Sequence, residues 1–384
     1  MATLQLAVID VKPGGALESQ SGLQMLRPRI FGAYAEPAGK KRIAAIVMHP
    51  SSNFMGHYLI EPLTQHGITC LGLNSRYAGN DTLLLMERVI QDLGAGVKFM
   101  RSLGYEKIIL IGNSGGAALA SFYQAQAENF TARHFVDGDE TGLCADDLPP
   151  ADGIALCAAH EGRSTLMLDW IDPSVTDEHD VMSVDPSLDL YDEQHGVPYA
   201  AEFLRRFKSA QRARRDRIEA WAIERLAQLR SIRGAPRDQV FTIYRTHADP
   251  RCVDLSIDAN DRAPGSVWGD ARFVNYSANA MGRVTSLTAF LSQWSSRSQA
   301  DGPSNLAKTT VPALLLTYTA DQSTFPSTRD AWLSAGGDRI HNVDVRGGNH
   351  YLTGQPTLVS QVADTISQWA SSFSVQAQRA CAQF

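Results

Sequence analysis

Three side chains of this sequence have the types that serine-based acyl transfer requires, and each follows an apolar run. Ser114 lies in a Gly-Asn-Ser-Gly-Gly pentapeptide, Asp321 follows residues 311–320, and His350 follows a glycine turn. A serine hydroxyl is a poor nucleophile at neutral pH, so it needs a histidine to take its proton and a carboxylate to orient that histidine. The residue types therefore predict a nucleophile, an acid and a base, in that order along the chain.

The pentapeptide around Ser114 stands between a predicted strand and a predicted helix. Residues 107–111 are the run Lys-Ile-Ile-Leu-Ile, and residues 117–123 read Ala-Ala-Leu-Ala-Ser-Phe-Tyr. Small residues at the glycine positions let the chain reverse sharply, which lifts the serine hydroxyl above the strand end. A G-x-S-x-G match alone is a weak signal, because many such matches are ordinary turns. The strand-turn-helix context favours a nucleophile.

The placement of Asp321 and His350 fits partners for Ser114. In an open parallel sheet, the groups that follow the carboxyl ends of different strands converge on one crevice. Asp321 lies in the turn after one apolar strand, and His350 lies in the glycine turn after the next. The structural alternative for Asp321 is a helix cap, and for His350 a packed histidine. The other candidate acids are Glu161 and Asp169, and the other candidate bases are His341 and His247.

The elements that must position these residues form a repeated strand-helix pattern. Apolar runs without alternation, typical of strands buried on both faces, occupy residues 43–48, 68–73, 108–111, 154–157 and 313–316. Segments of helical length follow the first three runs, at residues 54–66, 83–103 and 115–129. This order predicts an α/β fold with a mostly parallel sheet and helices on both faces.

Both ends of the chain add to the predicted sheet. Residues 4–11 and 29–35, separated by the turn Pro13-Gly14-Gly15, predict an antiparallel ribbon at one edge. Residues 340–345 predict a last strand, and residues 357–373 predict a closing helix.

An insertion interrupts this pattern between two core strands. We divide the chain into a first core part (1–160), an inserted lid (161–306) and a second core part (307–384). Residues 169–196 are acidic and lack Lys and Arg, whereas residues 202–233 form an Arg-rich helical stretch. The simplest interpretation is a set of surface ion pairs between the two. We expect the insertion to fold as a mainly helical lid over the crevice and to determine substrate choice.

On these residues the chain resembles the α/β-hydrolase superfamily, up to about His160 and again from about Ala307. The resemblance rests on the pentapeptide with Ser114, on Thr319-Ala320-Asp321 and on Gly347-Gly348-Asn349-His350. It looks most like the serine esterase or dienelactone-hydrolase-like group, with a large lid insertion. The resemblance implies an α/β-hydrolase fold and a Ser-Asp-His triad.

The resemblance also implies an oxyanion hole. His49-Pro50-Ser51-Ser52 stands where the superfamily often has a His-Gly turn that contributes to it. Because proline has no N–H, the Ser51 N–H is the better donor by position, and the Gly115 N–H is the expected second donor. His49 ends a strand and either lines the pocket or is a buried, hydrogen-bonded histidine, so it is placed outside the catalytic set.

The implied reaction is cleavage of an acyl bond. A carboxylic ester of a small organic molecule is the default substrate, because an alkoxide leaves more readily than an amide nitrogen. Thioester, lactone or carbon–carbon (β-diketone type) hydrolysis would use the same residues. His160, Trp170 and Tyr351 are expected to contact the substrate, and Trp268 is a further aromatic candidate.

Two classes of protein other than serine hydrolases share features of this sequence. A dinucleotide-binding unit also opens with a glycine turn after a strand, but Ser114 stands where its second glycine must admit the pyrophosphate, and the required acidic residue about 20 positions on is missing. A hydrolase-fold binding protein without catalysis is the second class, since a fold alone does not establish activity. The complete set of triad residue types argues against it.

The composition of the chain limits the kinds of molecule that it is expected to bind. A chain of 384 residues, 44% hydrophobic and 20% charged, predicts a globular protein, and the net charge of -6 gives no overall cationic field for nucleic acid or anionic membrane. With no signal peptide or membrane span at the sequence level, we expect a cytoplasmic protein with a small-molecule substrate. The 5 scattered cysteines lack C-x-x-C spacing, and His179 and His195 lack metal-site spacing, so we expect no metal and no cofactor. The sequence predicts no oligomeric state.

Overall fold

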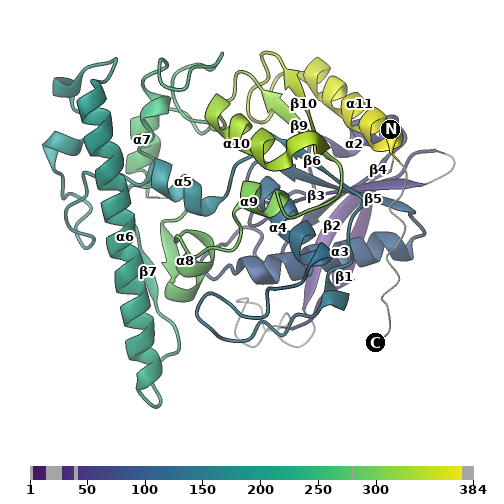
Figure 1. The fold of residues 1–384 in the computed structure, drawn as a ribbon, viewed down its shortest axis with the longest axis horizontal. Coiled ribbons are helices and arrows are strands. Elements are labelled where there is room, and N and C mark those ends of the chain that lie inside the picture. The colour runs from purple at the N-terminus through teal and green to yellow at the C-terminus, as the bar shows by residue number, and fades with distance from the viewer. Residues whose placement is uncertain (1–2, 14–27, 39–41, 279, 374–384) are drawn as a thin grey trace.

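The sheet of the computed structural model has the strand order β1-β2-β4-β3-β5-β6-β9-β10 (Figure 1). The structure describes residues 3–13, 28–38, 42–278 and 280–373. From β4 to β10 the neighbouring strands run parallel, whereas β1 and β2 form the predicted antiparallel ribbon at one edge. The predicted turn that joins β1 to β2 lies outside the described residues from Gly14 onward. The strands are β1 (Gln5–Asp10), β2 (Arg29–Ala35), β3 (Ile43–His49), β4 (Thr69–Asn74), β5 (Lys107–Asn113), β6 (Gly153–Cys157), β9 (Ala313–Tyr318) and β10 (Ile340–Val345).

Helices cover both faces of the sheet, because successive residues of a buried strand point to opposite sides. On β3, Ile46 belongs to the apolar cluster under α3 and α4, and Val47 to the cluster under α2 and α11. Both faces need apolar side chains, which explains the unbroken apolar runs. The core helices are α2 (Ile60–Gln65), α3 (Met86–Ser102), α4 (Gly116–Glu128), α9 (Gly302–Leu306), α10 (Pro326–Gly336) and α11 (Pro356–Ser372), with the 3₁₀ helices η1 (Ala145–Asp147) and η5 (Gly337–Arg339). The predicted α/β fold is confirmed.

Two predicted helices are shorter than the sequence suggested. The helix predicted over residues 54–66 exists only as α2, and turns precede it, with the Phe54 N–H donating to the Asn74 side chain at 2.8 Å. The helix predicted over residues 83–103 begins at Met86, whose N–H donates to the Ser292 hydroxyl at 2.9 Å.

The predicted insertion forms a layer beside the sheet, with the long helix α6 farthest from it and α5 and α8 in between (Figure 1). An apolar cluster joins α5, α6 and α8 through Trp170, Ile218 and Trp294. The elements of this layer are α5 (Arg163–Trp170), η2 (Pro186–Leu188), η3 (Glu193–His195), α6 (Ala201–Ser231), β7 (Val240–Thr242), η4 (Pro250–Cys252), α7 (Ala271–Tyr276), β8 (Val284–Ser286) and α8 (Leu287–Gln293). The final residues of the predicted insertion form α9, which packs on α4 and α10 of the core.

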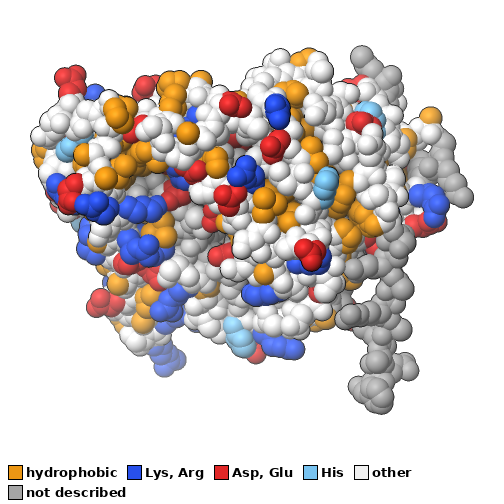
Figure 2. Space-filling model, turned by 45° about the horizontal axis from the view of Figure 1, so that its top comes forward, with side chains coloured by type: hydrophobic (Ala, Val, Ile, Leu, Met, Phe, Trp, Pro, Cys, Tyr) orange, Lys and Arg blue, Asp and Glu red, His pale blue; other side chains and the backbone are white. Residues whose placement is uncertain are grey.

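The acidic and basic side chains of the insertion form ion pairs, although not only at the surface. Figure 2 shows Lys and Arg side chains interspersed with Asp and Glu on the side that carries the insertion. Lys208 of α6 pairs with Asp169. Arg214 pairs with Glu178 at 2.7 Å, but its side chain is fully buried and also donates to backbone carbonyls. The prediction of surface pairs is therefore wrong for Arg214, whose several N–H donors are satisfied inside the protein.

The described residues contain four of the five cysteines of the chain. There, Cys70, Cys144, Cys157 and Cys252 are free thiols, and Cys381 lies outside the described ranges. Within those ranges, no group of three or more His, Cys, Asp or Glu side chains is placed to hold a metal ion. No helix in the described part of the chain combines the length and apolar composition that crossing a membrane requires.

Candidate active site

Ser114 lies at the sharp turn between β5 and α4. Its φ is +56°, in the left-handed region that residues other than glycine seldom adopt. The flanking glycines permit the turn: a Cβ on Gly112 would lie 2.4 Å from the Cα of Ala117, and one on Gly116 would lie 2.3 Å from the Met48 carbonyl oxygen. The small residues of the pentapeptide are thus required by close backbone approach on both sides of the serine.

The structure brings Ser114, His350 and Asp321 together, although they come from three different strand ends. The Ser114 hydroxyl lies 3.0 Å from Nε2 of His350. Nδ1 of the same ring lies 2.8 Å and 3.0 Å from the two carboxylate oxygens of Asp321. Because an ionised carboxylate can only accept, Nδ1 carries the proton and the neutral ring offers Nε2 as an acceptor to the serine.

Asp321 is held as a carboxylate although it is fully buried. Burial favours the neutral carboxyl, but the adjacent His350 and hydrogen bonds from Thr324 and Ser323 outweigh it, so the pKa of Asp321 is lowered from its ordinary value. The Thr324 hydroxyl donates at 2.7 Å and the Ser323 N–H at 2.7 Å. The helix-cap alternative is wrong, because the N-cap of α10 is Phe325 and has no side-chain hydrogen bond. The Asp321 carboxylate accepts instead from the turn before α10 and from His350.

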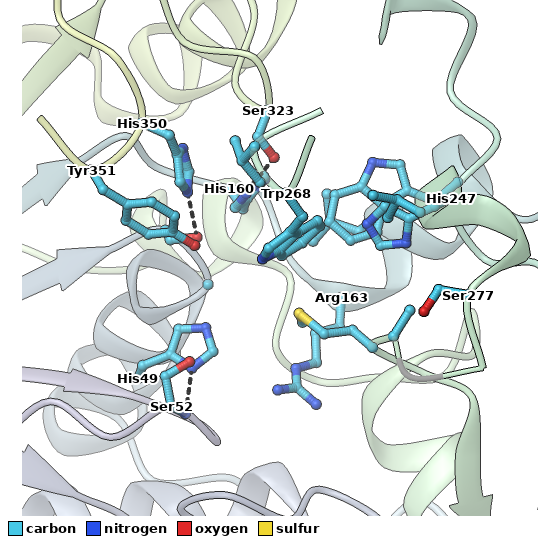
Figure 3. Close-up of a pocket in the computed structure, with 18 of the residues that line it drawn as sticks. His49, Ser52, His160, Arg163, His247, Trp268, Ser277, Ser323, His350 and Tyr351 are labelled. Atoms are coloured by element: carbon cyan, nitrogen blue, oxygen red, sulfur yellow. Dashed lines mark hydrogen bonds between the residues drawn. The ribbon is translucent and has the colours of Figure 1, made fainter. Parts of the chain in front are cut away.

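A cavity of about 470 Å³ opens at Ser114 (Figure 3). The strand-end side of the cavity is contributed by His49, Ser52, Gly115, His160 and His350. The opposite side comes from the predicted insertion, through Leu166, Trp170, His247, Trp268 and Met281. The insertion and the serine therefore share one cavity, and the role of the insertion as a substrate-selecting lid stays a prediction.

The three residues predicted to contact substrate all line this cavity. The Nε2 of His160 lies 3.1 Å from the Ser323 hydroxyl, and burial, reinforced by the nearby His350, lowers the pKa of His160 to about 3. Trp170 lies edge-on to His160, with ring centres 6.0 Å apart. Tyr351 lies edge-on to His350 at 4.5 Å. Their contact with a substrate stays a prediction.

His247 occupies an unusual position in the insertion wall. Its ring lies between Trp170 and Trp268, with ring centres 4.3 Å and 4.7 Å away. Burial lowers the pKa of His247 to about 3, and neither ring nitrogen has a hydrogen-bond partner among the described residues. The hydroxyl of Ser114 contacts His350 rather than His247, so His247 is not placed as the base.

The remaining candidates for the acid and the base have different surroundings from those of Asp321 and His350. Asp169 pairs with Lys208 and Arg251 in the insertion. The backbone carbonyl of Glu161 accepts from the Gly302 N–H, and Asp321 rather than Glu161 contacts His350. His341 is exposed on β10.

Of the two expected oxyanion donors, Gly115 and Ser51, only Gly115 lines the cavity. The Ser51 N–H, in contrast, donates to Nδ1 of His49 at 3.2 Å, and the Ser52 N–H donates to the same nitrogen at 2.9 Å. The structure thus does not support Ser51 as a donor to the cavity, because the His49 ring, two residues earlier, already accepts its N–H.

Comparison with known proteins concerns the fold of the chain as a whole. No family model matches the chain, and no curated protein matches its sequence. It is similar to DcsB, solved in complex with its substrate analogue, with 13% identity, a TM-score of 0.51, and coverage of 96% of this chain and 98% of that one. It is also similar to the α/β hydrolase GrgF from Penicillium sp. sh18, with 12% identity, a TM-score of 0.51, and coverage of 96% and 100%. The chain has the α/β-hydrolase fold.

One charged residue of this α/β-hydrolase cavity was missed by sequence reasoning. Arg163, at the start of α5, lines the cavity and is buried. Its guanidinium pairs with Asp81 at 2.9 Å and donates to the Ser51 hydroxyl, whereas its Nε has no partner among the described residues. The available signal was its position, since Arg163 follows β6 closely and the carboxyl ends of strands face the crevice.

Proposed function

We propose that the chain is a serine hydrolase that cleaves an acyl bond, with a carboxylic ester of a small organic molecule as its substrate. The observation that carries this proposal is the hydrogen-bonded series from the Ser114 hydroxyl through His350 to Asp321, with spacings of 3.0 Å and 2.8 Å. This spacing lets His350 accept the serine proton as the hydroxyl attacks an acyl carbonyl. His350 then returns the proton to the leaving group.

The tetrahedral intermediate would be stabilised at the N-terminus of α4. The Gly115 N–H lies there beside Ser114 and lines the cavity. The positive end of the α4 dipole adds to this field, because helix N-termini favour negative charge. Water, activated by the same His350, would then release the acid and restore the serine.

The cavity supports a small substrate. Its volume of about 470 Å³ falls within the range of about 300–1,000 Å³ that small-molecule pockets occupy. The aromatic and apolar insertion wall, with Trp170 and Trp268, suits an apolar portion of the ester.

The direct test is labelling with a fluorophosphonate, which phosphonylates activated serines, followed by peptide mapping. We expect the label on Ser114, and we expect Ser114→Ala to lose the label and to lower kcat by a factor on the order of 10⁶. Ser121→Ala is a matched control, because Ser121 is buried on α4 with no hydrogen-bond partner for its hydroxyl among the described residues. Labelling at another serine, or full activity in Ser114→Ala, would contradict the proposal.

A panel of acyl esters, thioesters, lactones and β-diketones then identifies the bond that is cleaved. Ester turnover that disappears in Ser114→Ala supports the default. Turnover of β-diketones, lactones or thioesters alone would replace the ester by that substrate class on the same residues. A protein that neither labels nor turns over any of them is better described as a binding protein on this fold.

A further inference from the structure

The turn after β3 leaves the proposed oxyanion site short of backbone donors. Pro50 has no N–H. The next two N–H groups, of Ser51 and Ser52, both donate to Nδ1 of His49, at 3.2 Å and 2.9 Å. The first three residues after the strand therefore offer the cavity no uncommitted N–H. Acyl transfer on a serine ordinarily uses at least two donors for the developing oxyanion, and the Gly115 N–H is one.

The same two hydrogen bonds determine where the His49 ring carries its proton. A ring nitrogen that accepts two N–H groups cannot itself bear hydrogen, so Nδ1 is the acceptor and Nε2 is the protonated nitrogen of the neutral ring. Burial, reinforced by the positive charge of Arg163, holds the pKa of His49 well below its ordinary value, so the ring remains neutral. His49 thus presents a fixed Nε2–H donor.

This donor lies against the nucleophile turn. Nε2 of His49 lies only 2.9 Å from the point where a Cβ on Gly115 would be. His49 and Gly115 both line the cavity that contains Ser114. Figure 3 shows the His49 ring between His350 and Ser52, with its hydrogen bond to Ser52 on the side away from His350. A side chain at position 115 would collide with this nitrogen, which gives Gly115 a reason beyond turn geometry.

We infer that the Nε2–H of His49 is the second hydrogen-bond donor to the oxyanion, acting beside the Gly115 N–H. The inference rests on the proposed function, since it assigns a role in the same acyl-transfer step. A neutral imidazole is a competent electrophile for a carbonyl oxygen. The ring replaces the backbone N–H that the sequence assigned to Ser51, and Ser51 and Ser52 serve to fix its tautomer.

Two substitutions at position 49 separate the two nitrogens. The amide oxygen of asparagine stands as many bonds from Cα as Nδ1 of histidine, so His49→Asn keeps an acceptor for the Ser51 and Ser52 N–H groups but removes the Nε2 donor. The amide nitrogen of glutamine stands as many bonds from Cα as Nε2, so His49→Gln keeps a donor near Gly115 but removes the Nδ1 acceptor. A purely structural role of His49 predicts that the glutamine variant is the more damaged one.

The measurement is the rate constant for fluorophosphonate labelling of Ser114, together with kcat and KM on whichever panel substrate is turned over. We expect His49→Asn to lower kcat and the labelling rate by about 10²–10³-fold, the loss typical of a missing oxyanion donor, with KM little changed. We expect His49→Gln to retain activity within about tenfold of wild type. Equal rates for His49→Asn and wild type, or greater loss in the glutamine variant, would overturn the role of His49.

The wild-type adduct provides a second measurement that does not depend on how the variants fold. In a crystal structure of the phosphonylated protein, we expect the phosphonyl oxygen within about 3.2 Å of both the Gly115 nitrogen and Nε2 of His49. An oxygen that contacts a different second donor would overturn the inference while leaving the proposed function intact. A wild type that is never labelled at Ser114 would refute the proposed function, and this inference with it.

Discussion

The two walls of the cavity are built in different ways. On the strand-end wall, hydrogen bonds link Ser114 to His350 and Asp321, and the Ser51 and Ser52 N–H groups hold the His49 ring. On the insertion wall, Trp170 and Trp268 pack around His247, whose two ring nitrogens have no partner among the described residues. Hydrogen-bonded polar side chains thus surround the proposed site of bond cleavage, whereas packed aromatic side chains form the wall that would contact the rest of the substrate.

This difference indicates a division of roles. Hydrogen-bonded polar groups hold one geometry, because breaking such a bond leaves a buried group unsatisfied. An apolar wall built from an insertion tolerates changes of shape with less loss, because packing contacts are individually weak. We therefore expect substitutions on the strand-end wall to change kcat and those on the insertion wall to change KM.

After the loss expected for Ser114→Ala, the largest effect is expected at the acid. Asp321→Asn keeps the size of the side chain but replaces the acceptor for Nδ1 of His350 with an amide, which favours the wrong tautomer of the ring. We expect kcat to fall by about 10⁴-fold. The control is Asp338→Asn, since Asp338 is exposed in η5. A fall in kcat of less than tenfold would contradict the idea that the residues of the strand-end wall determine the rate.

A smaller effect is expected from Trp268, an aromatic residue of the insertion that lines the cavity. Trp268 is 45% exposed and lies edge-on to Trp170. An aromatic contact contributes about 0.5–1.5 kcal/mol, so Trp268→Ala should raise KM about 2–10-fold for an ester with an apolar body and leave kcat nearly unchanged. Trp221→Ala is the matched control, since Trp221 is 40% exposed on α6. A change confined to kcat would argue against the division.

The smallest effect is expected for His247→Phe, and it concerns stability. The ring nitrogens of a buried histidine without hydrogen-bond partners contribute nothing to stability. An apolar ring of similar shape should therefore leave the free energy of unfolding unchanged or raise it by up to about 1 kcal/mol, with a melting temperature that is unchanged or higher.

His160→Phe is the matched comparison for His247→Phe. It should destabilise the fold by about 1–3 kcal/mol, because it leaves the Ser323 hydroxyl, now 3.1 Å from the His160 ring, unpaired. Thermal unfolding of both variants decides the matter. Destabilisation by His247→Phe comparable to that by His160→Phe would mean that the two walls do not differ in this respect.

The parts of the molecule that follow a repeating rule could be predicted from the sequence. The parallel strands follow from apolar runs, and the convergence of Ser114, Asp321 and His350 follows from their positions after strand ends. The helix predicted from residue 54 was wrong in its first half, where the chain forms turns tied to the end of β4 by the bond from the Phe54 N–H to the Asn74 side chain. A local pattern does not show such a contact with another strand.

The contacts of the turn after β3 and of the insertion wall could not be predicted from a repeating pattern. Ser51 was chosen as the residue after a proline, but its N–H belongs to the His49 ring, which is a side-chain contact and not a backbone position. His247 enters the cavity from a segment without helical or strand periodicity, so its placement depends on the folded insertion as a whole. Arg163 differs, because its position shortly after β6 was a usable signal.

The positive φ of Ser114 has a consequence for how this site can change over time. The left-handed backbone costs about 1–2 kcal/mol for a residue with a side chain, a strain that glycine at this position would relieve. Gly112 and Gly116 must remain glycine for reasons of packing. A Cβ added at either position would lie 2.4 Å or 2.3 Å, respectively, from a backbone atom. A descendant that abandoned the reaction would therefore gain stability by losing the serine while keeping both glycines, so drift at position 114 between unchanged neighbours is the expected trace of lost function.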